Sequence, residues 1–535
     1  MSIFAGKPWL RHYDYWVPPE ITFPRQSLYS ILQTAASQFR HRPATGFQGA
    51  VLTFEEIKRR ADALASSLHA AGLRKGDRLG IRLPNCPQYT IAFFAAMRLG
   101  LIVVNINPVY TAHEIRAVAS DSGFRALITL ESLVPEELPL DLLLTTSLAA
   151  YSLGGQPAGS FDDAIAAGDP ATLPPVSIDA EADVALLQYT GGTTGVSKGA
   201  MLSHYNLFAN VTQNAVWAQL LTRRGEERIL MVLPYFHIYG QVAGMLLSAW
   251  NGTQTILIPK FDVNLIVAAC REWEPTIFPG VPTLYISLLN HPEVAGCGLH
   301  KLRNCSAGAA PLPVEIIEQF ERMTGVLLRE GYGMTETACT STTTPFYSLR
   351  KPGSVGLPVP GTECKIVDID DPSRELGVNE EGELCVRGPQ VMKGYWNNPG
   401  ETAYALRDGW MLTGDIARMD ADGFFYIVQR KKDMIIVSGF KVFPNEVEEA
   451  LFVHPAVREA CVVGTPHPYR GEQVKAFVVP EPGQAPSAAE LISHCAGRLA
   501  KFKVPSEVEF IDALPKTAVG KVLRRVLRDR NTGRL

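Results

Sequence analysis

The sequence lacks several features that would assign it to a common class of protein. Its nine cysteines form no Cys-x-x-Cys pair, which argues against a zinc ribbon and a thioredoxin-type redox motif. It has no run of about 20 apolar residues without charges, so no membrane-spanning helix is expected. Lys and Arg number 50 and Asp and Glu 54, giving a net charge of −4. The chain therefore offers no strongly basic field, and no nucleic-acid partner is expected.

Other absences concern location and size. The first twenty residues lack the apolar core of a signal peptide, and an odd number of cysteines fits a reducing compartment. We therefore expect a cytoplasmic protein. A chain of 535 residues is too long for a single hydrophobic core, while 46% hydrophobic and 19% charged residues are ordinary for a globular chain. Several structural units are expected.

The pattern of expected helices and strands changes twice along the chain. Up to about residue 350 strands alternate with helices, which is typical of a mostly parallel sheet flanked by helices. Within this part, the Gly-, Pro- and Ala-rich segment 154–175 is expected to be a loop. Short strands dominate from 351 to 430 and predict a small barrel or sandwich. From 431 to 535 strands and helices alternate again, in a segment with 16 Lys and Arg against 12 Asp and Glu. The expected fold class is α/β.

Glycine and threonine are concentrated in segment 189–199, which reads Tyr-Thr-Gly-Gly-Thr-Thr-Gly-Val-Ser-Lys-Gly. It follows a short apolar strand, and we expect it to lead into a helix that starts near Ser203. Glycines let backbone N–H groups approach an anion, threonine hydroxyls add donors, and Lys198 adds a positive charge. These features predict a phosphate-binding loop, with a flexible surface turn as the alternative. A Walker A loop is excluded because no glycine precedes the lysine, and Gly-x-Gly-x-x-Gly is absent.

Two further segments carry groups that suit a nucleotide. Residues 331–337 place the ring of Tyr332 and the carboxylate of Glu336 in one turn after a strand. An aromatic ring can stack on a base, and a carboxylate can hold a hard cation beside phosphates. Asp415 follows an apolar strand, where its carboxylate could accept hydrogen bonds from two ribose hydroxyls. A tight turn with a surface glutamate, and a simple hairpin residue, are the alternatives.

Three more segments carry notable residues. On sequence alone, the small-residue segment 306–311 could be a helix-capping turn. Lys521 ends a loop before a basic helix, where a mobile lysine could stabilise charge developing on phosphates. A nucleic-acid tail is the alternative there, and it would require interleaved aromatic residues that this segment lacks. His237 lies among apolar residues, where a lone histidine is usually a satisfied core residue.

Together these motifs resemble those of the adenylate-forming acyl-CoA synthetases, also called AMP-binding ligases, over nearly the whole chain. Within that family the sequence is most similar to bacterial fatty acyl-CoA ligases. The similarity is carried by Tyr-Thr-Gly-Gly-Thr-Thr-Gly, Arg-Lys-Lys-Asp-Met-Ile, Ser-Gly-Phe-x-Val-x-Pro-Asn-Glu and Val-Gly-Lys-Val-Leu-Arg-Arg. The chain departs from the family's loop twice, because Gly191 replaces a hydroxyl residue and Ser197 replaces a proline. Position 191 therefore offers no side-chain oxygen to magnesium or phosphate.

The resemblance implies a role for each matching residue. The implied ATP-binding residues are Thr190, Gly192, Thr193, Thr194 and Lys198 in the loop, Gly308, Ala309 and Tyr332 at the adenine, Thr335 at the α-phosphate, and Asp415 and Arg430 at the ribose. The implied catalytic residues are Lys521, Glu336, Thr194 and His237, with Glu336 also binding magnesium. Lys432 would be a hinge between domains, and Ser438, Gly439 and Phe440 would line the pantetheine tunnel.

The resemblance also implies domains and a reaction. A large domain, 1–430, would contain helix-flanked sheets and a small β-barrel subdomain at about 351–430, followed by a small mobile α+β domain, 431–535. The expected enzyme uses ATP and Mg²⁺ to activate a carboxylic acid as acyl-AMP, then transfers the acyl group to coenzyme A. A medium- or long-chain fatty acid is the favoured substrate. Transfer to a carrier protein, an aryl or dicarboxylic acid substrate, and a scaffold without turnover stay open. A homodimer and peripheral membrane association also stay open.

Overall fold

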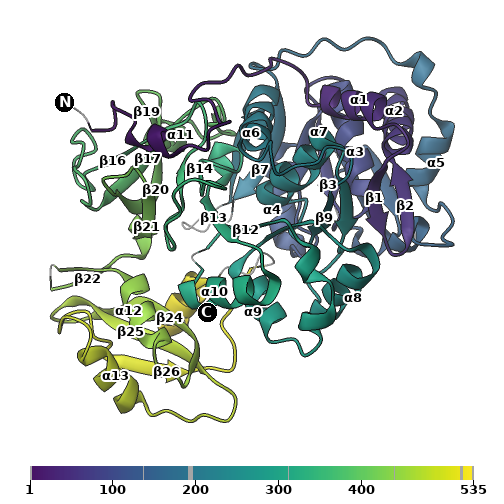
Figure 1. Ribbon diagram of the computed structural model, residues 1–535. Coiled ribbons are helices and arrows are strands. Elements are labelled where there is room, and N and C mark those ends of the chain that lie inside the picture. Colours follow the sequence, from purple (N-terminus) through teal and green to yellow (C-terminus); the bar gives the residue numbers. More distant parts are fainter. Residues whose placement is uncertain are drawn as a thin grey trace. The chain divides into compact units, whose positions relative to one another are not determined.

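The computed structural model describes residues 3–135, 138–190, 197–310, 312–438, 440–517 and 522–532. Gly192, Thr193, Thr194, Gly439 and Lys521 lie outside the described residues. The chain divides into two compact units. The smaller unit comprises Met1–Pro8, Cys364–Cys385 and Leu412–Leu535, and the larger unit comprises Trp9–Glu363 and Val386–Met411. The mixed α/β architecture expected from the sequence is confirmed (Figure 1).

The larger unit contains a nine-stranded sheet with the order β15-β14-β13-β12-β11-β9-β10-β1-β2. Its strands are β1 (Pro43–Phe47), β2 (Ala50–Thr53), β9 (Arg228–Met231), β10 (Gln254–Leu257), β11 (Ile277–Gly280), β12 (Asn304–Ala307), β13 (Leu328–Tyr332), β14 (Thr342–Thr343) and β15 (Leu357–Pro358). The six strands from β13 to β1 are parallel. Their carboxyl ends therefore meet at one edge, where the connecting loops can build a site.

A second sheet of the larger unit has seven strands in the order β18-β8-β7-β4-β3-β5-β6. These are β3 (Arg78–Arg82), β4 (Ile102–Asn105), β5 (Ala126–Leu130), β6 (Leu142–Thr146), β7 (Val184–Thr190), β8 (Lys198–Ser203) and β18 (Gly394–Tyr395). Strands β7 to β6 are parallel, whereas β8 is antiparallel to β7. The helix expected near Ser203 is confirmed, because a helix begins at His204 with Ser203 as its N-cap. Strand β8 stands between the glycine-rich loop and that helix.

Helices flank both sheets of the larger unit (Figure 1). They are α1 (Tyr29–Gln38), α2 (Phe54–Ala70), α3 (Pro87–Leu99), α4 (Ala112–Ser122), α5 (Ser160–Ala167), α6 (His204–Trp217), α7 (Leu247–Asn251), α8 (Val263–Trp273), α9 (Pro282–Leu289), α10 (Val314–Thr324) and α11 (Pro399–Ala405). Thr53, Thr111 and Ser203 begin α2, α4 and α6 with capping boxes, which satisfy otherwise unpaired N–H groups. Helix α5 lies inside segment 154–175, so the expectation of a continuous loop there is wrong.

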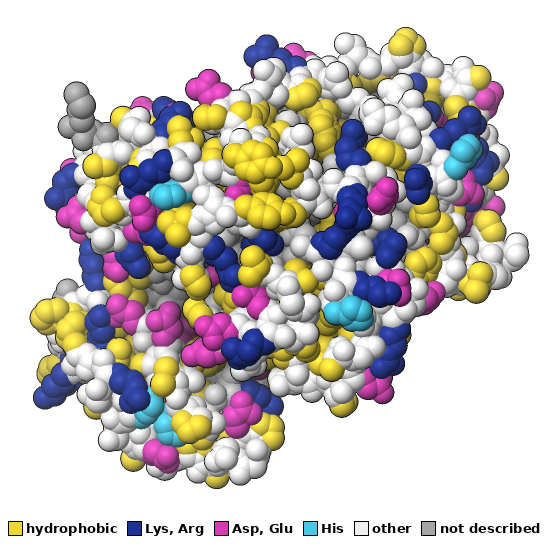
Figure 2. Space-filling model, in the orientation of Figure 1, with side chains coloured by type: hydrophobic (Ala, Val, Ile, Leu, Met, Phe, Trp, Pro, Cys, Tyr) yellow, Lys and Arg dark blue, Asp and Glu magenta, His cyan; other side chains and the backbone are white. Residues whose placement is uncertain are grey.

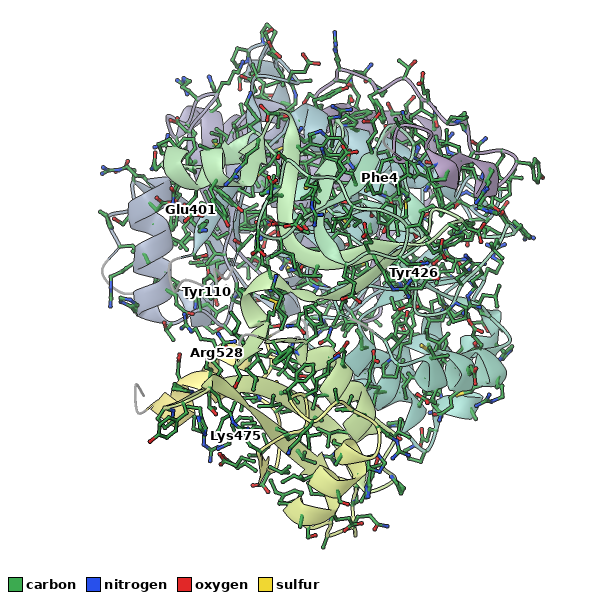
Figure 3. All side chains as sticks on the ribbon, turned by 90° about the vertical axis from the view of Figure 1, so that its left-hand side faces the viewer. Phe4, Tyr110, Glu401, Tyr426, Lys475 and Arg528 are labelled. Carbon is green, nitrogen blue, oxygen red and sulfur yellow. The ribbon has the colours of Figure 1, made fainter. Side chains whose placement is uncertain are left out.

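The smaller unit holds most residues of a five-stranded sheet, with the order β16-β17-β20-β19 and β21 paired to β20. A second five-stranded sheet has the order β23-β22-β25-β24, with β26 paired to β25. The elements are β16 (Glu363–Val367), β17 (Gly382–Arg387), β19 (Leu406–Arg407), β20 (Trp410–Met419), β21 (Phe425–Arg430), β22 (Ile435–Val437), β23 (Phe440–Val442), α12 (Pro444–Phe452), β24 (Val457–His467), β25 (Gly471–Pro480), α13 (Ala488–Ala496), β26 (Glu507–Phe510) and α14 (Arg524–Thr532). In this unit Lys475 forms ion pairs with Glu507 and Glu509, and Arg528 forms one with Asp433. Figure 3 labels the two basic residues.

Most charged side chains reach the surface of the molecule, whereas the cysteines lie in its interior. Acidic and basic side chains are interspersed on the face shown in Figure 2, in keeping with the small net charge. All nine cysteines are buried. No helix in the described part of the chain has both the length and the hydropathy that a membrane span requires.

A buried hydrogen-bond network joins the seven-stranded sheet to helix α3 and to the connection after β9. Asn105, the last residue of β4, is 3% exposed. Its amide nitrogen donates to the side-chain oxygens of Gln188 and Gln241, each at 2.8 Å, and its oxygen accepts from Tyr89 at 2.6 Å. Gln188 lies on β7, and Gln241 lies in a π-helix, Gly240–Leu246, in the connection after β9. The network thus fixes this connection against the seven-stranded sheet.

Further side-chain contacts hold the residues just after β9. The Asn85 amide nitrogen donates to the carbonyl oxygens of Met231 and Leu233, at 2.9 and 3.0 Å, and its oxygen accepts from the Tyr235 N–H at 2.7 Å. The Gln188 amide nitrogen donates to the carbonyl of Phe236 at 2.9 Å. The backbone up to position 237 is therefore held by residues of the seven-stranded sheet and its connections.

We predict that Asn105→Ala destabilises the larger unit. The substitution removes the donor to two buried glutamine oxygens and the acceptor of the Tyr89 hydroxyl. Leaving such groups unpaired costs about 1–3 kcal/mol each when they are buried. The thermal unfolding midpoint should fall by several degrees. Asn107→Ala is the control, because among the described residues the Asn107 side chain accepts one hydrogen bond, from the Val109 N–H in an exposed turn. Equal midpoints for the two variants would contradict the structural role given to Asn105.

Candidate active site

The glycine-rich loop closes a β-hairpin of the larger unit. Thr190, the last residue of β7, is the register partner of Lys198, the first residue of β8. The Thr190 hydroxyl donates to the Lys198 carbonyl at 3.4 Å. The Ser197 hydroxyl donates to the Thr190 carbonyl at 2.7 Å. Ser197 stands where the family has proline, and here its side chain closes the base of the loop.

Lys198 lies within a small charged cluster. Its Nζ is 2.5 Å from Oε2 of Glu401, on α11, and 5.4 Å from the ring centre of Tyr395, on β18. Glu401 is labelled in Figure 3. A cation over an aromatic face is attracted by the ring quadrupole. The lysine therefore has one anionic and one aromatic neighbour besides the loop that precedes it.

Glu336 is buried, with 7% of its surface exposed. It belongs to the one-turn 3₁₀-helix Thr335–Thr337 that follows β13. Its Oε1 accepts a hydrogen bond from the Tyr395 hydroxyl at 2.8 Å, and its carbonyl accepts from the Met392 N–H at 2.8 Å. Burial and the negative Glu336 beside it raise the pKa of Tyr395 above its ordinary value. At neutral pH the hydroxyl therefore stays protonated and donates to the carboxylate.

The backbone of this turn is closely packed, and this packing fixes the position of the Glu336 Cα atom. A Cβ atom at Gly333 would lie 1.4 Å from the Cys339 carbonyl oxygen, so only glycine fits there. The turn also carries Tyr332 and Thr335, both partly buried. The Tyr332 hydroxyl lies 3.9 Å from the Met334 sulfur. The aromatic, hydroxyl and carboxylate groups expected at a nucleotide site thus share one rigid segment.

The turn after β12 lies beside the turn after β13. Strands β12 and β13 are adjacent and parallel, and Ala307 is the register partner of Glu330. After β12, the Gly308 N–H donates to the Gly280 carbonyl at 3.2 Å, and Ala309 takes a positive φ of 70°. A Cβ on Gly308 would come within 3.1 Å of the Tyr239 ring. Gly308, Ala309 and Tyr332 are therefore brought to the same edge of the sheet.

His237 is held by its own segment but is only partly buried. Its Nδ1 accepts from the Tyr239 N–H at 3.2 Å, and the Tyr239 and Ser306 hydroxyls are 3.2 Å apart. His204 offers a contrast: it is completely buried, its Nδ1 accepts from the Leu28 N–H, and burial lowers its pKa to about 4. His204 has the environment of a core histidine. His237, which lies near Gly308 through Tyr239, does not share that environment.

In the smaller unit, Asp415 and Arg430 face each other across β20 and β21. They are register partners, and Arg430 Nε lies 3.6 Å from Asp415 Oδ1. Their side chains are 14% and 39% exposed, respectively. Buried Glu383 contacts β20 and the residue that follows β21, accepting from the Gly414 N–H at 3.0 Å and from Lys431 Nζ at 2.8 Å. The pair expected at a ribose is thus assembled on a rigid hairpin.

The remaining predicted residues of the smaller unit follow this hairpin. Lys432 lies in the 3₁₀-helix Lys431–Asp433, and loss of hydration, followed by repulsion from Arg430, lowers its pKa to about 8 even though part of the side chain is exposed. Ser438 has a positive φ of 51°, and its N–H donates to the Arg470 carbonyl at 2.8 Å. The Phe440 ring stacks on Phe502 with centres 4.7 Å apart.

Sequence reasoning missed Tyr395 and Glu401. Both lie far along the chain from Glu336 and Lys198, and they meet those residues only because β18 pairs with β8. No local pattern marks either residue. The buried Asn105 could have been found, because a polar residue at the end of an apolar strand is a local signal.

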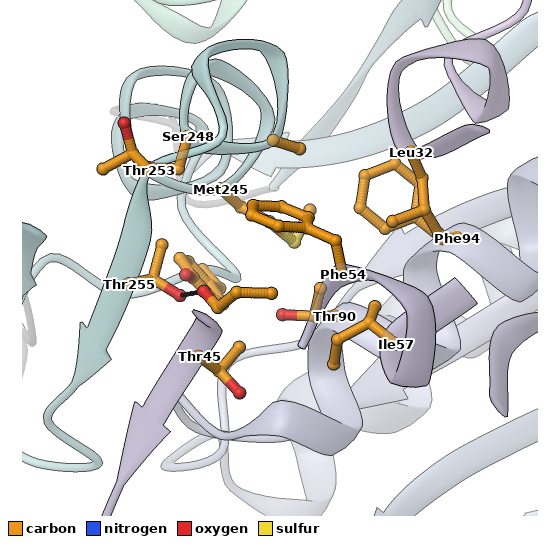
Figure 4. A pocket seen from close by; sticks show the side chains of 13 residues that line it. Leu32, Thr45, Phe54, Ile57, Thr90, Phe94, Met245, Ser248, Thr253 and Thr255 are labelled. Carbon is orange, nitrogen blue, oxygen red and sulfur yellow. Dashed lines mark hydrogen bonds between the residues drawn. The ribbon is translucent and has the colours of Figure 1, made fainter. Parts of the chain in front are cut away.

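One small cavity lies in the core of the larger unit, between β1, β10 and nearby helices (Figure 4). Its lining includes Thr45, Thr255, Phe54, Phe94 and Met245. Its volume of about 20 Å³ is enough for roughly one water molecule. The cavity is therefore too small to be the binding site of an organic substrate.

Comparisons with known proteins agree with these features. A family model described as AMP-binding enzyme matches residues 32–396, and one described as AMP-binding enzyme C-terminal domain matches residues 446–521. The long-chain-fatty-acid–CoA ligase of Bacillus subtilis (strain 168) is 42% identical to this chain over 99% of both chains. These findings confirm the family resemblance predicted from the sequence.

Solved structures show the same fold. ATP-bound MatB from Rhodopseudomonas palustris has a TM-score of 0.86 at 31% identity, covering 94% of this chain and 98% of that one. The anthranilate CoA ligase AuaEII in complex with anthranoyl-AMP has a TM-score of 0.85 at 28% identity, covering 95% and 98%. The likeness therefore extends over both units of the chain.

One carboxyl group beside the turn of Glu336 has an unusual environment. Glu330 lies on β13, and burial raises its pKa to about 7. The Gly353 N–H, 3.1 Å from Oε2, and the charge of Arg350 oppose this shift without cancelling it. Folding thus shifts Glu330 toward its protonated form.

We predict a pH-dependent loss of stability from Glu330. Because folding raises the pKa of Glu330, its contribution to the free energy of unfolding is fully present below about pH 4.5. That contribution is lost as the pH rises through about 7. The loss should be on the order of 1–2 kcal/mol, since partial hydration reduces it. Glu330→Gln should therefore raise the thermal midpoint at pH 8 and leave it nearly unchanged at pH 5. A midpoint difference independent of pH would contradict the assignment.

Proposed function

The chain belongs to the AMP-binding enzymes and is an acyl-CoA synthetase; from that premise we propose that its acid substrate is a medium- or long-chain fatty acid. The observation that carries this proposal is the end-to-end similarity to a long-chain-fatty-acid–CoA ligase. The proposed reaction converts the acid, ATP and coenzyme A to acyl-CoA, AMP and pyrophosphate. It takes place in two steps, each of which uses different residues of the chain.

In the first step an oxygen of the ionised carboxylate attacks the α-phosphorus of ATP, and the bond to pyrophosphate breaks. A carboxylate is already ionised at neutral pH, so no strong base is needed. Tyr332, Gly308 and Ala309 would contact the adenine, and Asp415 would accept hydrogen bonds from the ribose hydroxyls, with Arg430 beside it. Thr190, Thr193 and Thr194 would hold the departing pyrophosphate, Thr335 would contact the α-phosphate, and Lys521 would stabilise the charge that develops there.

Glu336 suits a magnesium ion. Magnesium is usually bound through one or two carboxylates together with phosphate oxygens of the substrate. Within the described ranges, no group of three or more His, Cys, Asp or Glu side chains converges on a common point, which fits a site completed by ATP. The ion would supply positive charge beside the phosphates. Gly191 adds no side-chain oxygen, so Glu336 would be the principal protein ligand.

In the second step the thiol of coenzyme A attacks the acyl carbon of acyl-AMP, its proton is lost, and AMP leaves. We propose that residues 431–535, the mobile domain implied by the family resemblance, rotate about Lys432 between the steps. The rotation would remove Lys521 and bring Ser438, Gly439 and Phe440 to the pantetheine. The positive φ of Ser438 and the stacked Phe440 ring are consistent with a shaped wall. His237 would orient the acid.

An aryl acid is the second candidate substrate, favoured by the structural likeness to an anthranilate CoA ligase. The decisive assay is release of AMP from ATP and Mg²⁺ with a graded series of fatty, aryl and dicarboxylic acids, with and without coenzyme A. We expect the highest rate with a fatty acid of medium or long chain, and only when coenzyme A is present. A higher rate with aryl acids would overturn the substrate assignment, and ATP–pyrophosphate exchange without thioester would indicate a carrier-protein acceptor.

We predict that Lys521→Ala separates the two steps. Acid-dependent ATP–pyrophosphate exchange should fall by about 10²–10³-fold, the usual effect of removing one transition-state donor. Transfer from added acyl-AMP to coenzyme A should persist. Lys516→Ala is the matched control, because Lys516 precedes the same loop and pairs with Glu459 at 2.5 Å. An unchanged exchange rate in Lys521→Ala would show that this lysine does not act in adenylation.

A further inference from the structure

The hydrogen bond between Tyr395 and Glu336 has features beyond ordinary core packing. It joins two buried side chains that are 59 positions apart, and its length is 2.8 Å. The Tyr395 N–H is itself bound by the Thr402 hydroxyl at 2.9 Å, and Tyr395 pairs with Ala200 between β18 and β8. The tyrosine is therefore fixed at its backbone before its hydroxyl reaches the carboxylate.

The ring of Tyr395 is supported from one side. Lys198 Nζ lies 5.4 Å from the ring centre, and Glu401 holds this lysine at 2.5 Å. Glu401 lies near the start of α11, where its N–H donates to the Asn398 side chain at 3.1 Å. A chain of contacts thus runs from α11 through Lys198 and Tyr395 to the carboxylate. It connects the end of the glycine-rich loop with the turn of Glu336.

Orientation of this carboxylate matters for magnesium. Magnesium requires a nearly ideal octahedral arrangement of oxygens, so a carboxylate that rotates binds it less well. A neutral hydroxyl donor fixes one carboxylate oxygen without removing the negative charge. Partners of this kind commonly change metal affinity by about 10–100-fold.

We infer that Tyr395, supported by Lys198 and Glu401, is a positioning residue that orients Glu336 for magnesium bound with ATP. The inference rests on the proposed function, since that function places the metal at Glu336. Tyr395 contacts neither substrate nor metal in this role and acts through the carboxylate. Lys198 then has two roles: it supports the Tyr395 ring, and it places a positive charge beside the phosphate loop.

The test measures ATP affinity by calorimetry in the full-length protein, once with Mg²⁺ and once with EDTA. The ratio of the two affinities is the magnesium-dependent gain. In Tyr395→Phe, which keeps the ring and its contact with Lys198, we expect this gain to fall by about 10-fold or more. The affinity in EDTA should change by less than about 2-fold. A merely structural role would lower both affinities together.

Tyr151→Phe is the matched control. Tyr151 is also a buried tyrosine whose hydroxyl lies 2.8 Å from a carboxylate, that of Asp162, and it lies in no segment of the site. Its magnesium-dependent gain should equal that of the unmodified protein. Glu401→Gln offers a second variant in case Tyr395→Phe folds poorly, because the Glu401 side chain is 39% exposed and keeps its size in this substitution. Weaker support of Lys198 should lower the gain by a smaller factor, about 2- to 5-fold.

A double-mutant cycle separates failure of this inference from failure of the proposed function. If Glu336→Gln abolishes the gain, Tyr395→Phe should add nothing in the Glu336→Gln background. An additive effect, or an unchanged gain in both Tyr395→Phe and Glu401→Gln, would overturn the role of Tyr395. If Glu336→Gln keeps the full gain, the magnesium assignment itself is wrong, and the inference falls with it.

Discussion

One buried amide, that of Asn105, ties the connection after β9 to the seven-stranded sheet and to helix α3. A side chain that donates to two glutamines and accepts from a tyrosine satisfies polar groups from β7, α3 and the π-helix at one point. In a low-dielectric core such a network is costly to break and is compatible with only one arrangement of its members. The connection that carries His237 is therefore fixed by hydrogen bonds, while apolar packing fills the space around it.

Much of the fold could be predicted from the sequence because its signals are local. Asp262 caps α8 through its side chain, as the residue type suggests, and Gly325 ends α10 with a positive φ. The segments proposed to bind adenine and ribose could be selected because aromatic, hydroxyl and carboxylate groups follow strands within short stretches of the chain. Family resemblance then supplied roles that residue types alone could not give.

What could not be predicted depends on contacts between distant segments. Helix α5 is anchored by the hydrogen bond from the Tyr151 hydroxyl to Asp162. The composition of segment 154–175 does not reveal this contact, and it suggested a loop. Strand β8 exists because β7 and β18 pair with it on either side. Tyr395 meets Glu336 for the same reason. In each case the partner that decides the local structure lies outside any window in which periodicity or turn residues can be read.

The burial of all nine cysteines has a consequence for an enzyme that handles activated acyl groups. Acyl-adenylates and thioesters react with thiolates, and an accessible protein thiol would compete with coenzyme A for the acyl group. Burial raises the pKa of Cys86 and of Cys385 to about 12, which keeps those sulfurs protonated as well as enclosed. Burial therefore limits contact between the chain's own thiols and activated acyl groups.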